Sequence, residues 1–331
     1  MDEMTEIYGT IGPACARPEL LRAMFDEGMT GMRLNTSHVS LHEAAGQVAM
    51  IHEAAAACGV QAKLLIDLQG PELRIGRLAA PMQLEEGAQT VFCEQGGSGI
   101  PVPGNVLEAL EPGMQALLDD GRILLEVTGE HTARVLRGGT LLGSKSIALP
   151  GADLEMPALT AQDRENISVA AAFGVTGVMQ PFVRSADDLM QVRMALDAAG
   201  GADIALLAKI ESMAGVAHLT DFFGLADEIV IARGDLGNAM PLWELPRVQK
   251  TISAKCRAAG VPFMVVTQML ASMVHSAVPT RAEVSDIYNA VCDGAASVMV
   301  TGETAAGDHP VEVIRYLART VRSAEEVLTG K

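Results

Sequence analysis

The feature of this sequence that most restricts its fold is a regular alternation of short apolar runs with longer amphipathic or alanine-rich stretches. Apolar runs of strand length recur eight times, and each is followed by a segment with helical periodicity. The runs lie at residues 7–11, 31–34, 62–67, 176–179, 204–210, 228–232, 262–267 and 296–301. An eightfold β/α alternation is typical of a (β/α)8 barrel, in which parallel strands close inside a ring of helices. We therefore predict an α/β fold of the TIM-barrel class.

One connection is too long for a simple helical crossover. Most neighbouring strands start about 23 to 34 residues apart, whereas the third and fourth are separated by about 110. Between them the sequence changes to short Val-, Leu- and Thr-rich segments broken by Gly and Pro. We predict a small β-barrel-like domain inserted after strand 3, at residues 74–148, and assign residues 1–73 and 149–331 to the barrel. Such an insert would act as a lid over the barrel mouth.

Composition restricts the partners of the chain. Its 331 residues include 41 acidic and 24 basic side chains, which gives a formal net charge of −17. A field of this sign repels phosphates, so neither nucleic acid nor an anionic membrane is an expected partner. The acidic start of the chain, and the absence of any apolar run of transmembrane length, favour a cytoplasmic enzyme. Five widely spaced cysteines without a CxxC motif are expected to be reduced, structural thiols.

Polar residues collect where the predicted strands end. They lie in the segments TIGPAC, RLNTSH, DLQGPELR, QPFVR, KIES, ARGDLG, TQML and TGET. In a (β/α)8 barrel the active-site groups lie at this end, where the βα loops begin. Few conspicuous polar residues lie at the opposite ends of the strands. The carboxyl-terminal end of the barrel is therefore the predicted active site.

The strongest cluster begins on strand five, where Lys209 and Glu211 alternate and therefore share a face. Arg233, Gly234 and Asp235 end the next strand, which adds a cation, a bare backbone amide and a carboxylate. Glu211 and Asp235 are candidate ligands of one Mg²⁺ ion, because hard carboxylate oxygens suit this cation. Lys209 would stabilise charge that develops on an enolate or a transferring phosphoryl group. The alternative is a pair of salt-bridged acids, with Lys209 as the ion-pair partner of Glu211.

Further candidates lie at other strand ends, each with a structural alternative. Arg33 fits a clamp for a phosphate or carboxylate, and the alternative is a surface salt bridge. The amides of Gly234 and Asp235 would hold a carboxylate, but a simple tight turn also explains the glycine. Thr267 and Thr301 would contact substrate or relay protons, and helix capping is the alternative for both.

Two other groups of residues point less strongly to a ligand. An oxygen cage for a monovalent cation would combine Asn35, Ser37, Asp67 and the backbone carbonyl of Leu68, although the residue pattern alone does not favour it. His38 and His42 have the i, i+4 spacing of a metal-binding pair. Capping or packed histidines are the preferred interpretation of that spacing.

Taken together, these segments resemble the pyruvate kinase family. The matching text is TIGPAC, MRLNTSH, IDLQGPELRIG, LPGADLEMPALT, AKIES, IARGDLG, TQMLASM with PTRAEV, and TGETAAGDHP, in family order over nearly the whole chain. The resemblance implies transfer of a phosphoryl group from phosphoenolpyruvate to ADP, giving pyruvate and ATP, in a barrel capped by a mobile β domain. It also implies Mg²⁺ or Mn²⁺ as a cofactor, and a site for K⁺.

The resemblance also implies roles for individual residues. By position, Glu211 and Asp235 would hold Mg²⁺, and Lys209 would steady the phosphoryl group in flight. Arg33 would grip the phosphate, while the amides of Gly234 and Asp235, together with Thr267, would bind the carboxylate end of the substrate. The remaining matches assign Asn35, Ser37, Asp67 and the Leu68 carbonyl to potassium, assign His38, Arg74 and Lys145 to the nucleotide, and place Thr301 near the proton path to the enolate.

The sequence departs from the family pattern in several places. It stops before the C-terminal effector domain that the family normally carries, so we expect no allostery through such a domain. The same departure puts the family tetramer in doubt and leaves another homo-oligomer open. Leu68-Gln69 is the pair associated with potassium-independent members, whereas Glu72 is associated with potassium-dependent ones. We favour dependence, because Glu72 adds negative charge that an external cation can offset.

Two other functions use the same residues. The first is a Mg²⁺-dependent aldolase or lyase that acts on oxo acids on the same barrel, and the second is a catalytically weak binding or regulatory homologue. Arg74, Lys145 and the lid favour the kinase, since an aldolase needs no nucleotide site. The intact set of cations and acids at the barrel mouth argues against a catalytically weak homologue.

Overall fold

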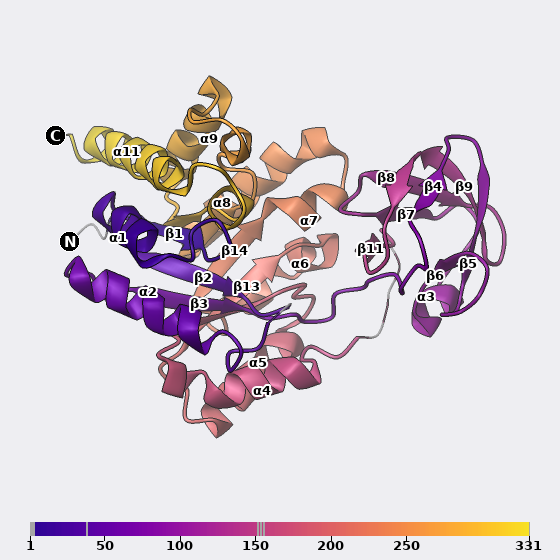
Figure 1. Cartoon of the computed structure of the whole chain (residues 1–331), viewed down its shortest axis with the longest axis horizontal. Helices are drawn as coiled ribbons and strands as arrows, with labels where there is room; N and C mark the ends of the chain where they lie inside the picture. Colours follow the sequence, from indigo (N-terminus) through magenta and orange to yellow (C-terminus); the bar gives the residue numbers. More distant parts are fainter. Residues whose placement is uncertain (1–3, 38, 151, 153, 155, 331) are drawn as a thin grey trace. The chain divides into compact units, whose positions relative to one another are not determined.

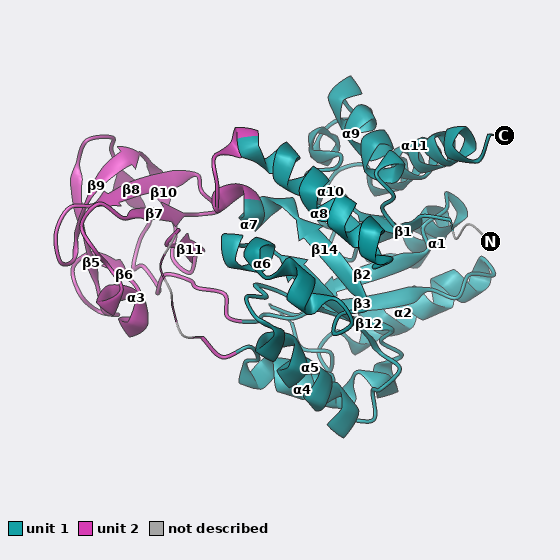
Figure 2. Ribbon diagram, turned by 180° about the vertical axis from the view of Figure 1, so that it is seen from behind, with its two compact units in different colours: residues 1–70, 158–236, 244–331 teal, residues 71–157, 237–243 magenta. Residues whose placement is uncertain are grey.

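The computed structural model in Figure 1 describes residues 4–37, 39–150, 152, 154 and 156–330. The chain divides into two units, which Figure 2 colours separately. The barrel unit comprises Met1–Gly70, Ala158–Leu236 and Glu244–Lys331, and the insert unit comprises Pro71–Pro157 and Gly237–Trp243. The predicted insert lies within the second unit, which also includes a short segment that follows the sixth barrel strand. Within the described residues, every helix is too short or too polar to span a bilayer.

The barrel unit is built on eight parallel strands that close into a barrel. In order around the barrel they are β1 (Glu6–Thr10), β2 (Gly31–Asn35), β3 (Lys63–Asp67), β12 (Gly177–Gln180), β13 (Ala205–Ile210), β14 (Glu228–Ala232), β15 (Phe263–Val266) and β16 (Ser297–Met299), which pairs with β1. All eight coincide with the predicted apolar runs, and the (β/α)8 fold class is confirmed. The register places Asn35 beside Asp67 at the ends of β2 and β3.

Helices follow the strands, and Figure 1 shows the longer ones packed outside the barrel. The α-helices of this unit are α1 (Pro18–Asp26), α2 (Ala45–Ala57), α4 (Ala161–Val169), α5 (Ala186–Ala198), α6 (Met213–Ala217), α7 (Arg233–Asn238), α8 (Leu245–Ala259), α9 (Arg281–Cys292), α10 (Gly302–Ala305) and α11 (Pro310–Thr329). Short 3₁₀ helices of this unit are η1 (Ala171–Phe173), η2 (Leu219–Phe222) and η4 (Ala271–Val274). A further one, η3 (Leu242–Glu244), begins in the segment assigned to the insert unit and precedes α8. Thr160, Ser185 and Thr280 begin α4, α5 and α9 with capping boxes, so these helix starts are encoded locally.

The inside of the barrel is filled by side chains at alternate strand positions. One buried cluster contains Tyr8, Leu65, Met179, Leu207, Val230, Ala232, Met264, Val266 and Met299. Such layers make the interior of a (β/α)8 barrel a packed core and not a channel. Polar groups on the strands are therefore confined to the two ends of the barrel.

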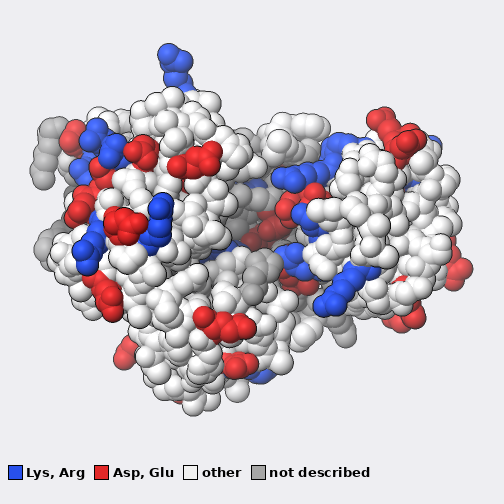
Figure 3. Space-filling view, in the orientation of Figure 1, with Lys and Arg blue, Asp and Glu red and all other residues white. Residues whose placement is uncertain are grey.

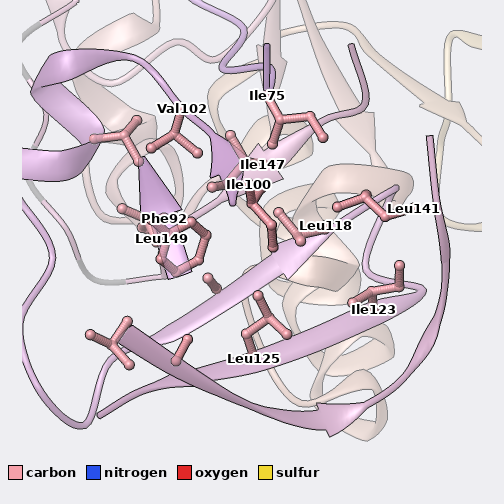
Figure 4. Packing of buried hydrophobic residues seen from close by; sticks show 14 of the residues in the cluster. Ile75, Phe92, Ile100, Val102, Leu118, Ile123, Leu125, Leu141, Ile147 and Leu149 are labelled. Carbon is pink, nitrogen blue, oxygen red and sulfur yellow. The ribbon is translucent and has the colours of Figure 1, made fainter. Parts of the chain in front are cut away.

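The insert unit is a β domain with a core of its own. Its elements are β4 (Met82–Leu84), β5 (Gln89–Cys93), β6 (Ile100–Pro101), α3 (Gly104–Glu108), β7 (Gln115–Leu118), β8 (Ile123–Val127), β9 (Thr132–Arg137), β10 (Gly139–Leu141) and β11 (Ile147–Ala148). Strands β10 and β4 form one sheet, and the order β11-β7-β8-β9-β5-β6 forms another. The turn between β7 and β8 runs through Asp119, Asp120 and Gly121 at positive φ, as the sequence DDG favours. Figure 4 shows Phe92 and Leu125 among the side chains that fill the core.

The amino-terminal ends of the barrel strands are more polar than we predicted. Glu6, Lys63, Glu228 and Ser297 are the first residues of β1, β3, β14 and β16. Lys63 forms an ion pair with Glu6, and the Ser297 hydroxyl donates to Glu228 Oε1 at 2.5 Å. The expectation of few polar residues here was wrong, because one polar residue at the start of an apolar run is inconspicuous in a sequence.

This polar cluster gives the barrel a pH-dependent contribution to stability. Burial raises the pKa of Glu228 to about 7, and repulsion from Glu6 adds to the rise, while the Ser297 hydroxyl and Lys63 oppose it. Because the folded-state pKa exceeds the ordinary value of 4.5, folding favours the protonated carboxyl. The stabilising contribution is complete below about pH 4.5 and is lost as the pH rises through about 7.

We predict that Glu228→Gln removes this pH dependence. Between about pH 5 and pH 8, the free energy of unfolding of the wild-type protein should fall by about 1 to 2 kcal/mol relative to Glu228→Gln. Urea titrations at several pH values measure the difference. Glu244→Gln, which removes an exposed partner of Arg247, is the control and should follow the wild-type protein. A constant difference between wild type and Glu228→Gln would contradict the assignment.

Candidate active site

Asp67, the last residue of β3, is a carboxylate that gathers two cations while being only 3% exposed. Arg33, on β2, donates from Nε and Nη2 to Asp67 Oδ2 at 2.9 and 2.7 Å. Lys209, on β13, places Nζ 3.1 and 3.2 Å from the two carboxylate oxygens. The two cationic side chains are each 13% exposed, so water screens these contacts weakly. Three strands thus deliver one buried ion cluster to the carboxyl-terminal end of the barrel.

Glu211 joins this cluster through Lys209. Its Oε1 lies 3.0 Å from Lys209 Nζ, and its Oε2 accepts the backbone N–H of Phe182 at 2.7 Å. Phe182 has a φ of 52°, in the left-handed region that a bulky residue seldom adopts. The alternating pair on β13 therefore enters one site, and the ion pair that we considered as an alternative is present.

The charges of the cluster depend on one another. Burial works against the ionised form of Asp67, but Lys209 and Arg33 outweigh it and hold the pKa of Asp67 below its usual value. Burial likewise opposes the charge of Lys209, yet Asp67 and Glu211 raise its pKa above the ordinary value. Burial raises the pKa of Glu211 to about 7, Lys209 counteracts this rise, and Asp235 and Asp67 add to it. Near neutral pH, Glu211 is therefore the group of this cluster that exchanges a proton.

The two predicted metal ligands are close enough to repel each other electrostatically. Asp235 lies in the first turn of α7, directly after β14, and it contributes to the raised pKa of Glu211. A divalent cation between two such carboxylates would relieve their repulsion, so the donor set fits Mg²⁺ or Mn²⁺. The described residues contain no group of three or more acidic, His or Cys side chains arranged for a metal. The protein would thus supply two carboxylates and leave other positions to substrate and water, as is usual for Mg²⁺.

The loop that begins with Thr267 contacts the loop that carries Gly234. A Cβ atom on Gly234 would lie 3.1 Å from Cγ2 and 3.7 Å from Oγ1 of Thr267, which shows how closely the two approach. Arg233, which the sequence suggested as a further cation of the site, donates to the Thr267 carbonyl and pairs with Asp286 at 2.7 Å. The structure therefore uses Arg233 to hold the Thr267 loop.

Thr301, which follows β16, is held by an acid of the next helix. Its backbone N–H donates to Oε2 of Glu303 at 2.7 Å, and its hydroxyl contacts the same oxygen at 3.3 Å. Glu303 is buried and also accepts the N–H of Leu270 at 3.3 Å. Thr301 begins α10, but its side chain makes no capping hydrogen bond, so these contacts do not decide between the two interpretations of Thr301.

Of the oxygens predicted to form a potassium cage, those of Asn35 and Asp67 take part in contacts within the protein. Asn35 Oδ1 accepts the N–H of Ser37 at 3.0 Å, and the Asp67 carboxylate binds the two cations described above. The loop after β3 is fixed, because Asp163 accepts the N–H of Gln69 at 2.8 Å. A second role for Asp67, as the counter-charge of two cations, was not predicted.

In the insert unit, Arg74 and Lys145 lie near each other. Arg74 Nη1 donates to the carbonyl of Ser144, the residue before Lys145, at 2.9 Å. Arg74 also pairs with Glu72 at 2.8 Å, and Lys145 pairs with Asp119 at 2.7 Å. Arg74 thus offsets part of the charge of Glu72, and potassium dependence stays a prediction.

The two histidines of the i, i+4 pair have different outcomes. His38, predicted to contact the nucleotide, lies outside the described residues. The His42 ring packs edge-on against Phe173 with ring centroids 5.6 Å apart, as expected for a packed histidine.

Comparison with known proteins decides the family. A family model described as "Pyruvate kinase, barrel domain" matches residues 2–314. The chain belongs to the pyruvate kinase family. Pyruvate kinase of Geobacillus stearothermophilus is 37% identical over 340 residues, which cover 99% of this chain and 58% of that protein. For pyruvate kinase of Agrobacterium vitis the identity is 39%, with 97% and 68% covered, and for that of Leishmania mexicana it is 35%, with 97% and 67% covered.

Membership of the pyruvate kinase family confirms the resemblance that the motifs suggested. The chain spans less than two thirds of the length of the Geobacillus stearothermophilus relative.

Motifs alone did not reveal the Asp67 ion cluster or the contact of Arg233 with Asp286. A signal for the first was present, because an acid that ends a buried apolar strand needs a cation or hydrogen-bond donors.

We predict that Asp67→Asn lowers the free energy of unfolding by about 3 kcal/mol, because two buried cations lose their counter-charge. Urea titration of the two proteins measures the loss. Asp221→Asn, which removes an exposed partner of His218 in the same unit, should cost less than about 1 kcal/mol. Equal effects of the two substitutions would show that the Asp67 cluster contributes no more than a surface ion pair.

Proposed function

We propose that this chain transfers a phosphoryl group from phosphoenolpyruvate to ADP, giving pyruvate and ATP. The observation that carries the proposal is the gathering of Arg33 and Lys209 around one buried carboxylate, beside Glu211. Phosphoryl transfer needs positioned positive charge more than covalent help. Family membership supports the same reaction.

Arg33 is suited to bind the phosphate of the substrate. Its Nε and Nη2 are committed to Asp67, whereas within the described part of the chain Nη1 makes only a long contact of 3.4 Å to the Thr10 hydroxyl. The carboxylate thus orients a guanidinium that retains donor capacity for an anion. Charge and direction are set before the substrate arrives, which is the condition for effective electrostatic stabilisation.

Lys209 is suited to stabilise the transferring group. During the reaction the bond from phosphorus to the enol oxygen breaks and a bond to the terminal oxygen of ADP forms. The enolate then takes up a proton and becomes pyruvate. The Lys209 ammonium is nearly buried and is held charged by two carboxylates. Its attraction for the phosphoryl oxygens is therefore weakly screened by water.

We assign the remaining groups of the barrel mouth as follows. Glu211 and Asp235 would hold Mg²⁺ or Mn²⁺, which supplies positive charge beside the phosphoryl oxygens when it is bound. The amides of Gly234 and Asp235, with Thr267, would bind the substrate carboxylate, and Thr301 would lie near the proton path. K⁺ would bind at Asn35, Ser37, Asp67 and the Leu68 carbonyl.

We assign nucleotide binding to His38, Arg74 and Lys145, and the role of a lid to the insert unit. The partners we propose are the small anions phosphoenolpyruvate, ADP or ATP, and pyruvate. We do not propose nucleic acid as a partner. Acidic and basic side chains are interspersed over the barrel unit on the face in Figure 3, which supports local and not surface-wide anion binding.

All five cysteines are free thiols, which fits the reducing cytoplasm as the location we propose.

The decisive assay measures pyruvate and ATP formed from phosphoenolpyruvate and ADP with Mg²⁺ present. Formation of both supports the proposal, whereas pyruvate without ATP would show that the phosphoryl group passes to water and not to ADP. Cleavage of an added oxo acid would favour a lyase. No product would favour a binding or regulatory homologue. Rates in K⁺, Na⁺ and tetramethylammonium then show whether a monovalent cation is required.

We predict that Lys209→Met lowers kcat at least about a hundredfold, because a group that stabilises transition-state charge contributes roughly 3 kcal/mol. Steady-state kinetics measure the change, and circular dichroism checks that the variant is folded. Lys250→Met, which removes a half-exposed lysine paired with Asp293, is the matched control and should keep normal kcat. Near-normal turnover of Lys209→Met would refute its assignment.

We predict that Mn²⁺ binding in the absence of substrate depends on the proton of Glu211. Since the pKa of Glu211 is raised to about 7, the metal must displace a proton below that pH. The apparent association constant should therefore rise about tenfold per pH unit below pH 7 and level off above it. Electron paramagnetic resonance of free Mn²⁺ measures it. Glu211→Gln should bind weakly without this slope, and a pH-independent wild-type affinity would contradict the assignment.

A further inference from the structure

The backbone at the end of β15 has an unfavourable conformation. Thr267 and Gln268, the two residues after the strand, have φ values of 79° and 56°. This left-handed region is unfavourable for residues with a Cβ, and most of all for a β-branched residue such as threonine. Such backbone is energetically costly and persists only when surrounding contacts hold it.

The contact that holds Thr267 comes from Arg233 at the start of α7. Arg233 Nε and Nη2 donate to the Thr267 carbonyl oxygen at 3.2 and 2.8 Å. The same Nη2 lies 2.9 Å from the sulfur of Met269. The guanidinium is only 11% exposed, so both hydrogen bonds are largely shielded from water. Two donors that converge on one carbonyl fix its direction, and with it the turn at Thr267.

Arg233 is in turn held by Asp286 on α9. Asp286 Oδ2 lies 2.7 Å from Arg233 Nη1, and Gln249 Oε1 lies 3.5 Å from the same nitrogen. The guanidinium is therefore bound on one side by a carboxylate and donates on the other side to the Thr267 carbonyl. We call this chain of contacts, from Asp286 through Arg233 to Thr267, the Asp286 brace.

The Asp286 brace acts on the place where we have proposed that the substrate carboxylate binds. Thr267 and Gly234 approach so closely that a Cβ on Gly234 would lie 3.1 Å from Thr267 Cγ2. A rotation of the Thr267 backbone would move the Thr267 side chain away from Gly234. The direction of the Thr267 carbonyl thus sets the geometry of the proposed carboxylate site.

We propose that Arg233 and Asp286 are positioning residues for substrate binding. They hold Thr267 in a left-handed conformation that presents its side chain to Gly234. Neither residue needs to touch the substrate. The expected change in substrate binding rests on the proposed function. The mechanical claim, that Arg233 and Asp286 hold the Thr267 backbone, does not rest on it.

Asp286→Asn and Arg233→Lys test the Asp286 brace. Loss of a contact that serves substrate and transition state equally raises KM and leaves kcat unchanged. We expect KM for phosphoenolpyruvate to rise about tenfold in both variants, with kcat within about twofold of wild type. KM for ADP should not change. Asp286→Glu keeps the carboxylate and should restore most of the affinity.

Asp293→Asn is the matched control for Asp286→Asn. Asp293 follows the last residue of α9 and pairs with Lys250 at 2.7 Å, the same distance as the pair of Asp286 with Arg233. Among the described residues its contacts beyond α9 are with Lys250 and Arg257, and not with the Thr267 loop. A general effect of removing an ion pair from α9 would appear in both variants, whereas an effect of the Asp286 brace appears only in Asp286→Asn.

Hydrogen exchange followed by mass spectrometry measures how well the backbone amides are protected, and it does not depend on enzymatic activity. Peptides that cover residues 267–270 should exchange faster in Asp286→Asn and Arg233→Lys than in Asp293→Asn. Faster exchange together with a raised KM supports the inference, and unchanged exchange, or faster exchange with unchanged KM, overturns it. If the wild-type protein forms no pyruvate while exchange still responds, the proposed function fails and the mechanical claim stands.

Discussion

The carboxylate of Asp67 is the contact on which the barrel mouth depends. Two cations that are each 13% exposed would repel each other and lose hydration without it. With it, Arg33 and Lys209 are charged, oriented and held at the ends of separate strands. A protein of net charge −17 thereby places two cationic side chains together at one end of its barrel. If the proposed function holds, this local arrangement, and not the total charge, decides which anion the barrel binds.

The fold supplies the distances that this cluster needs. Parallel strands bring their last residues to the same end of the barrel, and the alternation of side chains turns Lys209 and Glu211 to one face. The packed interior below them consists of apolar side chains such as Leu207 and Val230. Charges at the mouth therefore lie above a medium that screens weakly, so each acts strongly on its neighbours. The raised pKa of Glu211 and the lowered pKa of Asp67 are two consequences of that one environment.

The fold and part of the site follow from local sequence patterns, because periodicity and strand ends are local properties. The shared face of Lys209 and Glu211 needs only their spacing of two residues. The contact of Asp67 with Lys209 joins residues 142 positions apart, and that of Arg233 with Asp286 joins residues 53 apart. Pairings at such separations depend on the closure of the barrel, which no local pattern encodes. The acid Glu228 was missed for another reason, since it looks like the edge of an apolar run.

Backbone strain in the barrel unit lies where the site lies. Its described non-glycine residues with left-handed φ are Phe182, Thr267 and Gln268, which follow β12 and β15 at the mouth. The Phe182 N–H binds Glu211, and the Thr267 carbonyl binds Arg233. The strained segments are thus held by charged side chains, and charge-assisted hydrogen bonds are strong enough to offset a cost of a few kcal/mol. A change in the charge of Glu211 is therefore also a change in the force on the backbone beside it. Protonation of Glu211 and loop conformation at this mouth are for that reason linked.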